Sequence, residues 1–407
     1  MVVSPIQRDV FICDKCAKIV TSVISGEINK KASKPLRDEW KNLSPTNNST
    51  TEKQKLLDGS CSMTPSEIHR ELDRYVIGQE KAKKILSVAV YNHSKRLNDR
   101  TGLIKKSNIL IAGPSGCGKT LLAGTLARIL HVPFVVVDAT SLTEAGYVGE
   151  DVEICLQRLI GMADGDIELA QKGIVYIDEI DKIARVGENR SSTRDVSGEG
   201  VQASLLKLIE GCEVSVSFGE KRKHSNRNTT LFNTSNVLFI CGGAFEGLIN
   251  RPSQNRPIGF TATGSAAQDD TEPILTPESL IKYGMMPELV GRLPILCGLA
   301  ELGEDDLIRV LTEPEDAITK EYALLFDTDG VKLTYEEDAL REVARLAVAK
   351  KTGARGLRAI LEDVMLDVMY ELPDMRNIKE CIITQESIST KKPVLIQKRG
   401  KKKVSAP

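Results

Sequence analysis

The sequence predicts an α/β protein in which a parallel sheet with crossover helices is followed by a smaller, mainly helical C-terminal domain. Three observations predict this fold. Short apolar runs alternate with helical patterns from Asn108 onwards, a glycine-rich phosphate-binding pattern follows the first run, and the chain turns strongly helical beyond Gly303. The runs that we expect to form strands are 109–112, 134–137, 174–177 and 237–241.

The chain before the sheet divides into a small first segment, a linker and two helices. Residues 1–40 contain Cys13-Asp14-Lys15-Cys16, and residues 41–63 are polar, which is typical of a flexible linker. Thr64-Pro65-Ser66-Glu67 is a capping box with proline at the first helical position, so a helix should begin there. Apolar residues at helical spacing predict a second helix within 78–98.

The sheet and its helices are predicted to form a large nucleotide-binding domain over residues 64–300, and a small domain is predicted over 301–390. A basic segment, Lys398-Arg399-Gly400-Lys401-Lys402-Lys403, indicates a disordered tail within 391–407. Helices of the small domain are expected at 304–311, 315–326, 337–350 and 356–370.

Composition limits the class of protein. At roughly 150 residues per domain, a chain of 407 residues suggests two or three domains. The net charge of -1 gives no bulk attraction to nucleic acid or to an anionic membrane, and no apolar run approaches the roughly 18 residues of a membrane span. The N-terminus lacks a secretory signal pattern. Nine cysteines scattered among apolar segments favour reduced thiols in the cytoplasm.

The strongest motif is Gly113-Pro114-Ser115-Gly116-Cys117-Gly118-Lys119-Thr120, which fits the phosphate-loop pattern G-x-x-x-x-G-K-[ST] without a mismatch. A strand precedes it and a helix over 121–130 is expected after it, so backbone N–H groups and the positive helix end would face phosphate. Lys119 would reach the β- and γ-phosphates of ATP, and the Thr120 hydroxyl would hold Mg²⁺. A glycine-rich turn that binds nothing is the alternative, which the complete motif in this context disfavours.

Two carboxylates follow the third predicted strand. Because ligands of such sheets bind at the carboxyl ends of the strands, Asp178 and Glu179 should face the same crevice as the phosphate loop. Asp178 would hold Mg²⁺, usually through water, and Glu179 would orient and polarise the attacking water. The alternative is a strand that ends in a solvated acidic turn.

Two arginines are candidates for contacts with phosphate. Arg292, in Gly291-Arg292-Leu293-Pro294, is a candidate arginine finger offered to the nucleotide of a neighbouring subunit. Arg355 lies at an expected helix start, where it could contact phosphate and couple the nucleotide state to domain rotation. For both, a solvated surface arginine is the alternative.

The loop Gly146-Tyr147-Val148-Gly149 places an aromatic and a β-branched side chain between glycines. This pattern suits a mobile loop that grips and pushes on a polymer, and the alternative is a hairpin tip packed on the core.

Together these motifs resemble the ClpX family of AAA+ unfoldases, which feed the ClpP peptidase, over the segment from about Ile68 to Leu372. The resemblance implies an AAA+ P-loop NTPase that forms a hexameric ring, uses ATP and Mg²⁺, unfolds tagged or unfolded proteins, and works with adaptors and ClpP. It also implies that Val76 and Ile77 flank the adenine and that Leu121 joins the phosphate loop in binding nucleotide. Arg292 and Arg355 fall on the arginine-finger and sensor-2 positions.

The same resemblance assigns the loops that handle substrate and peptidase. Tyr147 and Val148 match the first pore loop, and Arg194 lies in a segment similar to the second pore loop. Arg222-Lys223-His224 matches the basic loop at the pore entrance, and Ile258-Gly259-Phe260 matches the tripeptide that docks into ClpP clefts.

The chain departs from the family pattern at two places. The family binds zinc through two Cys-x-x-Cys pairs, whereas here one pair, Cys13 and Cys16, stands in the first 40 residues. Since a closed structural site needs four ligands, this is a zinc half-site that a dimer could complete, and zinc binding and adaptor recruitment stay open. Many AAA+ proteins also place a polar sensor after the 237–241 strand, where this chain has Cys241-Gly242-Gly243, so no sensor-1 residue is assigned.

The predicted function is an ATP hydrolase that unfolds proteins and threads them into ClpP, acts as a chaperone, and is not itself a peptidase. One alternative is a DNA-remodelling AAA+ motor, which should show a basic stripe facing DNA. The net charge and the aromatic-apolar loop at Tyr147 argue against it, and no nucleic acid or membrane partner is expected. The other alternative is a chaperone without a peptidase, against which Ile258-Gly259-Phe260 argues.

Overall fold

The computed structural model describes residues 2–3, 11–12, 63–99, 101–143, 150–184, 198–218, 228–248, 275–375, 377–397 and 403–405. The chain divides into two compact units, Met1–Lys55 and Leu56–Pro407. In the first unit the described residues are two short strands, β1 (Val2–Val3) and β2 (Phe11–Ile12), which pair antiparallel.

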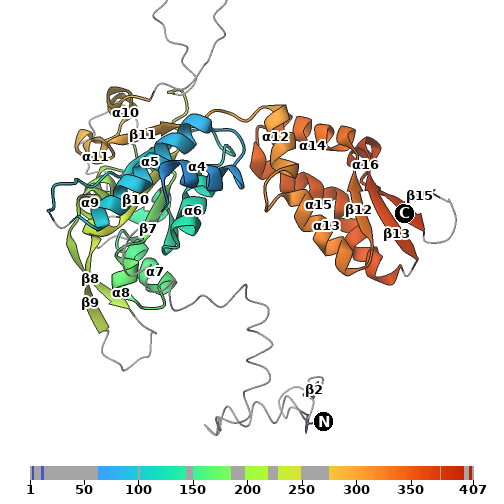
Figure 1. The fold of residues 1–407 in the computed structure, drawn as a ribbon, viewed down its shortest axis with the longest axis horizontal. Coiled ribbons are helices and arrows are strands. Elements are labelled where there is room, and N and C mark those ends of the chain that lie inside the picture. The colour runs from blue at the N-terminus through green and yellow to red at the C-terminus, as the bar shows by residue number, and fades with distance from the viewer. Residues whose placement is uncertain are drawn as a thin grey trace, which may run out of the picture. The chain divides into compact units, whose positions relative to one another are not determined.

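The second unit begins with two helices, α4 (Pro65–Asp73) and α5 (Glu80–Leu97) (Figure 1). The predicted capping box is confirmed: the backbone N–H of Thr64 donates to Glu67 Oε2 at 2.6 Å, and Thr64 Oγ1 accepts from the Glu67 backbone at 3.4 Å. Because proline needs no hydrogen-bond partner at the first helical position, Pro65 opens α4 at no cost.

The central sheet has five parallel strands in the order β11-β3-β10-β7-β4, which confirms the predicted parallel sheet with crossover helices. Four of its strands come from the predicted apolar runs, and the fifth, β11, lies at an edge next to β3. The strands are β3 (Ile109–Ala112), β4 (Phe134–Asp138), β7 (Ile174–Asp178), β10 (Leu238–Gly243) and β11 (Ile295–Gly298).

Helices pack on both faces of this sheet. Ile109 and Ile111 of β3 belong to one buried cluster with residues of α4, α5 and α6, whereas Leu110 belongs to another cluster with residues of α7 and α9. This alternation follows from the period of two in a strand. The helices that follow β3 are α6 (Lys119–Leu130), α7 (Ile154–Met162), α8 (Ile167–Ala170), α9 (Glu199–Glu210), α10 (Pro277–Tyr283) and α11 (Pro287–Gly291).

Two small sheets and three single 3₁₀ turns complete this part. Strand β8 (Glu213–Phe218) pairs antiparallel with β9 (Asn228–Asn233), and β5 (Leu142–Thr143) pairs parallel with β6 (Glu150–Asp151). The turns are η1 (Ala139–Ser141), η2 (Ile180–Ile183) and η3 (Thr234–Asn236).

The C-terminal part is mostly helical, as predicted, and has its own buried cluster, which includes Leu311, Phe326 and Leu361. Its helices are α12 (Glu304–Thr312), α13 (Ile318–Thr328), α14 (Glu337–Ala349), α15 (Ala354–Glu371), the 3₁₀ turn η4 (Leu372–Asp374) and α16 (Gln385–Thr390). The sequence analysis did not predict the sheet that accompanies them, whose strands are β12 (Lys332–Tyr335), β13 (Ile378–Ile383), β14 (Val394–Gln397) and β15 (Lys403–Ser405).

Two expectations for this part differ from the structure. The helix expected over 315–326 begins at Ile318, because the backbone N–H of Glu315 donates to the carbonyl of Arg74 at 3.0 Å and holds the preceding turn against the end of α4. Within residues 391–407, where a disordered basic tail was expected, the described residues include two strands, β14 and β15, which pair antiparallel. The domain boundaries given above stay a prediction.

In the described part of the chain, no helix is long and apolar enough to cross a membrane.

Candidate active site

The phosphate-loop motif forms the turn between β3 and α6. Gly116 and Gly118 have φ values of 77° and 97°, a left-handed conformation that glycine adopts at low cost. Helix α6 begins at Lys119, two residues before the predicted start, and Gly118 gives it no side-chain cap. The N–H groups of its first turn are therefore directed at the pocket, as an anion site requires.

The side chain of Lys119 folds back over this loop. Its Nζ donates to the carbonyl oxygen of Gly113 at 2.6 Å and to that of Pro114 at 2.9 Å. The neighbouring Cys117 is buried, and burial raises the pKa of its thiol. The loop thus presents one ammonium group and no thiolate.

Asp178 ends β7 beside the start of α6. Thr120 Oγ1 donates to Asp178 Oδ2 at 3.1 Å, so a hydroxyl oxygen and a carboxylate oxygen lie side by side. Hard oxygen atoms of this kind are the ligands that Mg²⁺ prefers. The two residues that the sequence assigned to Mg²⁺ therefore fit that ion.

Glu179 follows Asp178 with a φ of 55°, a left-handed conformation that costs a non-glycine residue about 1–3 kcal/mol. This backbone turns the exposed Glu179 side chain into the pocket. Strain of this kind at the end of a central strand is typical of a functional position.

One pocket of about 460 Å³ brings most of these residues together. Arg355 joins them from the first turn of α15, where Gly353 precedes the helix and the backbone N–H of Ala354 donates to the carbonyl of Gly116 at 3.2 Å. The predicted residues that line the pocket are Ser115, Gly116, Gly118, Lys119, Thr120, Leu121, Asp178, Glu179 and Arg355.

Arg292 does not line this pocket. It caps the end of α11, its side chain is 58% exposed, and its Nε donates to Glu210 Oε1 at 2.8 Å. Its carbonyl accepts a hydrogen bond from Asn108 Nδ2 at 3.1 Å. The structure thus places Arg292 at the surface, beside the end of α9.

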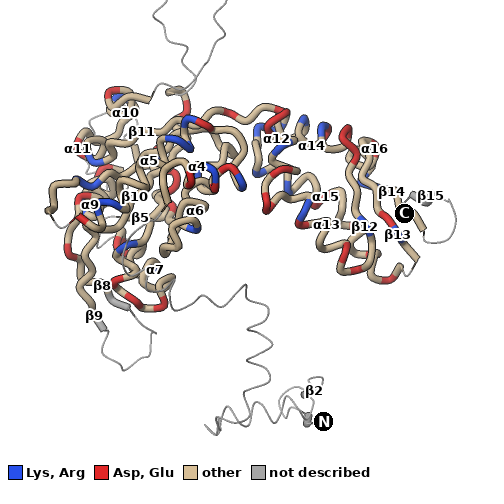
Figure 2. The backbone as a smooth tube through the Cα atoms, in the orientation of Figure 1, with Lys and Arg blue, Asp and Glu red and all other residues tan. Residues whose placement is uncertain are grey.

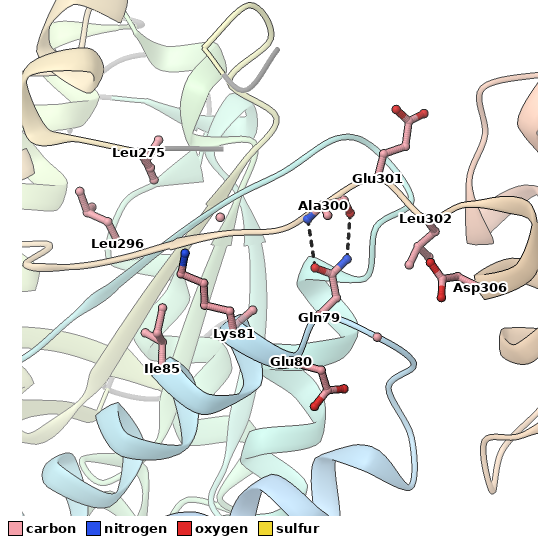
Figure 3. Close-up of a pocket in the computed structure, with 13 residues that line it drawn as sticks. Gln79, Glu80, Lys81, Ile85, Leu275, Leu296, Ala300, Glu301, Leu302 and Asp306 are labelled. Atoms are coloured by element: carbon pink, nitrogen blue, oxygen red, sulfur yellow. Dashed lines mark hydrogen bonds between the residues drawn. The ribbon is translucent and has the colours of Figure 1, made fainter. Parts of the chain in front are cut away.

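Val76 and Ile77, the residues predicted to flank adenine, are buried and also do not line the pocket. They directly precede Gly78 and Gln79 in the sequence, and these two residues line a second pocket of about 580 Å³, which is drawn in Figure 3. There the Gln79 side chain donates to the Ala300 carbonyl at 2.8 Å and accepts from the Ala300 N–H at 3.0 Å. These two bonds join the start of α5 to the segment between β11 and α12.

The predicted metal half-site and substrate loops lie outside the described residues. They are Cys13, Cys16, Tyr147, Val148, Arg194, Arg222, Lys223, His224, Ile258, Gly259 and Phe260.

Two of the residues that the sequence analysis missed at the site are Asp181 and Tyr176. Asp181 is buried and lines the pocket, and its carboxylate accepts from the backbone N–H groups of Ala244 at 3.1 Å and Phe245 at 3.4 Å. Tyr176 is fully buried, and its hydroxyl donates to Asp178 Oδ1 at 3.2 Å. Two signals in the sequence could have found them: Asp181 is a carboxylate three residues after Asp178, and Tyr176 carries a hydroxyl in an otherwise aliphatic strand.

Comparisons with known proteins agree with this arrangement. Residues 104–296 match the model of the AAA domain (Cdc48 subfamily), and residues 302–384 match that of the C-terminal, D2-small domain of ClpB protein. The parallel sheet, the phosphate loop and the helical C-terminal part thus define an AAA+ ATPase.

Three relatives indicate which family of AAA+ ATPases this is. Proteins named ATP-dependent Clp protease ATP-binding subunit ClpX from Borrelia duttonii (strain Ly) and Borrelia recurrentis (strain A1) are each 48% identical over 391 residues, which are 94% of this chain and 86% of theirs. The protein of that name from Treponema denticola is 46% identical over 398 residues, 94% of this chain and 90% of its own. The chain therefore belongs to the ClpX family, which confirms the resemblance found in the sequence.

Proposed function

We propose that this chain is the ATP-hydrolysing subunit of a Clp protease, and that it unfolds proteins and feeds them into the ClpP peptidase. The observation that carries the proposal is the single pocket in which the phosphate loop, Asp178, Glu179 and Arg355 meet. The printed names of the relatives, ATP-dependent Clp protease ATP-binding subunit, support the choice of partner.

The predicted site residues have separate roles in this proposal. Lys119 and the N–H groups of α6 bind the phosphates of ATP, and Thr120 and Asp178 hold Mg²⁺, which when bound neutralises phosphate charge. Glu179 orients the attacking water and accepts its proton, since it is the exposed carboxylate at this end of β7. Arg355 contacts phosphate from α15 and makes that helix sensitive to the nucleotide.

Arg292 acts on the pocket of a neighbouring subunit in a hexameric ring. Its exposure, and its absence from the pocket of its own chain, support a role between subunits. Its ion pair with Glu210 lies at the surface, where such pairs contribute only about 0–1 kcal/mol. Arg292 can therefore leave Glu210 for a phosphate at little cost.

The mechanical work is assigned to loops outside the described residues. Tyr147 and Val148 grip the polypeptide, with Arg194 in the second pore loop, and the segment 222–224 attracts exposed carboxylates at the entrance. Residues 258–260 dock on ClpP. Substrate proteins are stable by only about 5–15 kcal/mol, so repeated strokes can trap local opening.

Cys13 and Cys16 are proposed as a zinc half-site that a second chain completes, because one pair supplies two of the four ligands of a closed site. Adaptor recruitment through this segment depends on that pairing.

The charge distribution favours a protein substrate over DNA. In the described part of the chain, Figure 2 shows basic and acidic residues interspersed along the helices rather than a basic stripe. Pairs such as Arg309 with Glu313 and Arg341 with Glu337 neutralise one another within a helix. A DNA motor would need its cations free for phosphate contacts.

The hydrolysis site is tested by comparing Glu179→Gln with Glu246→Gln, a change in another exposed carboxylate that lines the same pocket. Glu179→Gln should bind ATP and assemble but hydrolyse almost none, whereas Glu246→Gln should retain most of the turnover. Normal ATP turnover in Glu179→Gln would refute the role assigned to this carboxylate.

The unfolding function is tested with purified ClpP and a folded substrate that carries a C-terminal tag. Tyr147→Ala should keep ATPase activity and lose degradation, and deletion of residues 258–260 should abolish degradation while unfolding persists. Unchanged degradation after the deletion would favour a chaperone that works without a peptidase. Salt-sensitive binding to DNA, with no ATPase response to protein substrates, would favour the DNA motor.

A further inference from the structure

Tyr176 brings a hydroxyl group to the carboxylate of Asp178 from within the same strand. The side chain is fully buried, and its hydroxyl donates to Asp178 Oδ1 at 3.2 Å. A carboxylate oxygen accepts hydrogen bonds, so the hydroxyl of Tyr176 is the donor in this contact. The other residues of β7 before Asp178 are aliphatic, which makes this hydroxyl an exception that calls for a reason.

The neighbouring strand leaves space for this hydroxyl. At Gly242 of β10, a Cβ atom would lie 1.9 Å from the hydroxyl oxygen of Tyr176 and 2.6 Å from its Cζ. Any larger residue at position 242 would therefore displace the tyrosine ring. Strand β10 ends in Cys241-Gly242-Gly243, and the hydroxyl of Tyr176 occupies the place where a side chain at position 242 would stand.

The carboxylate of Asp178 is held at both oxygen atoms. Oδ1 accepts from the Tyr176 hydroxyl and from the backbone N–H of Glu179 at 3.0 Å, while Oδ2 accepts from Thr120 Oγ1 at 3.1 Å. Two donors on Oδ1 fix the plane of the carboxylate. Oδ2 is therefore the oxygen that faces the hydroxyl of Thr120, and Thr120 is the other residue that fits Mg²⁺.

We propose that Tyr176 is a positioning residue that orients Asp178 for Mg²⁺. The inference rests on the nucleotide site proposed above. Outer-sphere partners of a metal ligand fix its orientation, and their loss typically lowers metal affinity by about 10- to 100-fold. A purely structural role, in which the hydroxyl only satisfies its own need for a partner in the core, is the competing explanation.

The test compares Tyr176→Phe with Tyr335→Phe in the full-length chain. Each change removes one hydroxyl and keeps the ring, but the Tyr335 hydroxyl faces Met365 Sδ at 3.6 Å and touches no residue of the pocket. The measurement is the binding of a fluorescent ATP analogue as Mg²⁺ is titrated, without turnover. Tyr176→Phe should raise the half-saturating Mg²⁺ concentration by about 10-fold or more and leave metal-free nucleotide affinity within about twofold. Tyr335→Phe should change neither quantity.

A second variant protects the test against a folding defect. Gly242→Ala keeps the hydroxyl but forces the Tyr176 ring out of its observed position, so it should also raise the Mg²⁺ requirement. Wild-type Mg²⁺ dependence in a folded Tyr176→Phe or Gly242→Ala chain would overturn the inference and leave the proposed function standing. If the unaltered chain binds the analogue without any dependence on Mg²⁺, the proposed metal site itself fails.

Discussion

Replacing Asn108 with alanine is expected to loosen a junction of three elements at the amino end of the central sheet. Asn108 is only 2% exposed. Its Nδ2 donates to the carbonyls of Ile209 at 3.3 Å and Arg292 at 3.1 Å, and its Oδ1 accepts from the backbone N–H of Phe239 at 3.3 Å. One side chain thus joins β10, the end of α9 and the residue proposed as the arginine finger.

The size of the effect follows from the groups that the Asn108→Ala change leaves behind. A buried polar group that loses its partner costs about 1–3 kcal/mol. The carbonyl of Ile209 and the N–H of Phe239 belong to buried residues, whereas Arg292 is exposed and its carbonyl can turn to water. The expected loss of stability for the two buried groups is therefore about 2–6 kcal/mol. With a urea slope of about 3 kcal/mol per molar, the unfolding midpoint falls by about 0.7–2 M.

The assay is urea unfolding followed by circular dichroism, with Asn236→Ala as the matched control. Asn236 is exposed and accepts a long hydrogen bond from Arg96 Nη1 at 3.4 Å, so its removal should cost less than about 0.5 kcal/mol. Equal midpoints for Asn108→Ala and Asn236→Ala would refute the reasoning. ATP binding by Asn108→Ala under native conditions should persist, because Asn108 does not line the pocket.

Two further predictions concern acid stability and the phosphate loop. His93 is buried, neither ring nitrogen has a hydrogen-bond partner among the described residues, and burial lowers its pKa to about 3 from 6.5. As the pH falls below 6.5, His93 becomes protonated in the unfolded chain but stays neutral in the folded chain down to about pH 3. The free energy of unfolding should therefore fall by up to about 1.4 kcal/mol per pH unit between pH 6.5 and pH 3. His93→Leu should lose less stability between pH 7 and pH 4.5 in denaturant titrations, and an equal loss would contradict this. Gly116→Ala should speed hydrogen exchange at the Ala354 amide, because a Cβ would lie 2.5 Å from the Thr352 carbonyl. Gly118→Ala is the control, because Gly118 also has a left-handed backbone but a Cβ there would meet nothing within 4 Å. In that variant the Ala354 amide should exchange at the wild-type rate.

Most residues that the sequence predicts for the nucleotide site lie in one pocket, and the signals that predict them are local. The apolar run before the phosphate loop is bounded by Asn108 and Gly113, and β3 occupies the predicted residues 109–112. The loop, the helix after it and the carboxylates after β7 each follow from short patterns. Their meeting in one pocket follows from parallel pairing, since the carboxyl ends of such strands lie at one edge.

Contacts between distant segments are what the sequence does not predict. The hydroxyl of Tyr176 fits in the core because Gly242, on the neighbouring strand β10, has no side chain to displace it. The start of α13 is decided by a hydrogen bond from Glu315 to Arg74, which overrides a helical pattern. The C-terminal sheet is built from strands of three to six residues, the first three of which are separated by helices, and such short runs carry little periodicity.

Strand β3 links the proposed pocket to the proposed finger of the same chain. All four of its residues are fully buried, and the strand lies between β10 and β11 in the close-packed core. Gly113 at one end opens the phosphate loop, while Asn108 at the other end holds the carbonyl of Arg292. Four residues span about 13 Å at about 3.3 Å each. The phosphate loop and the backbone of Arg292 are therefore joined by one buried strand and one hydrogen bond, without a loop between them.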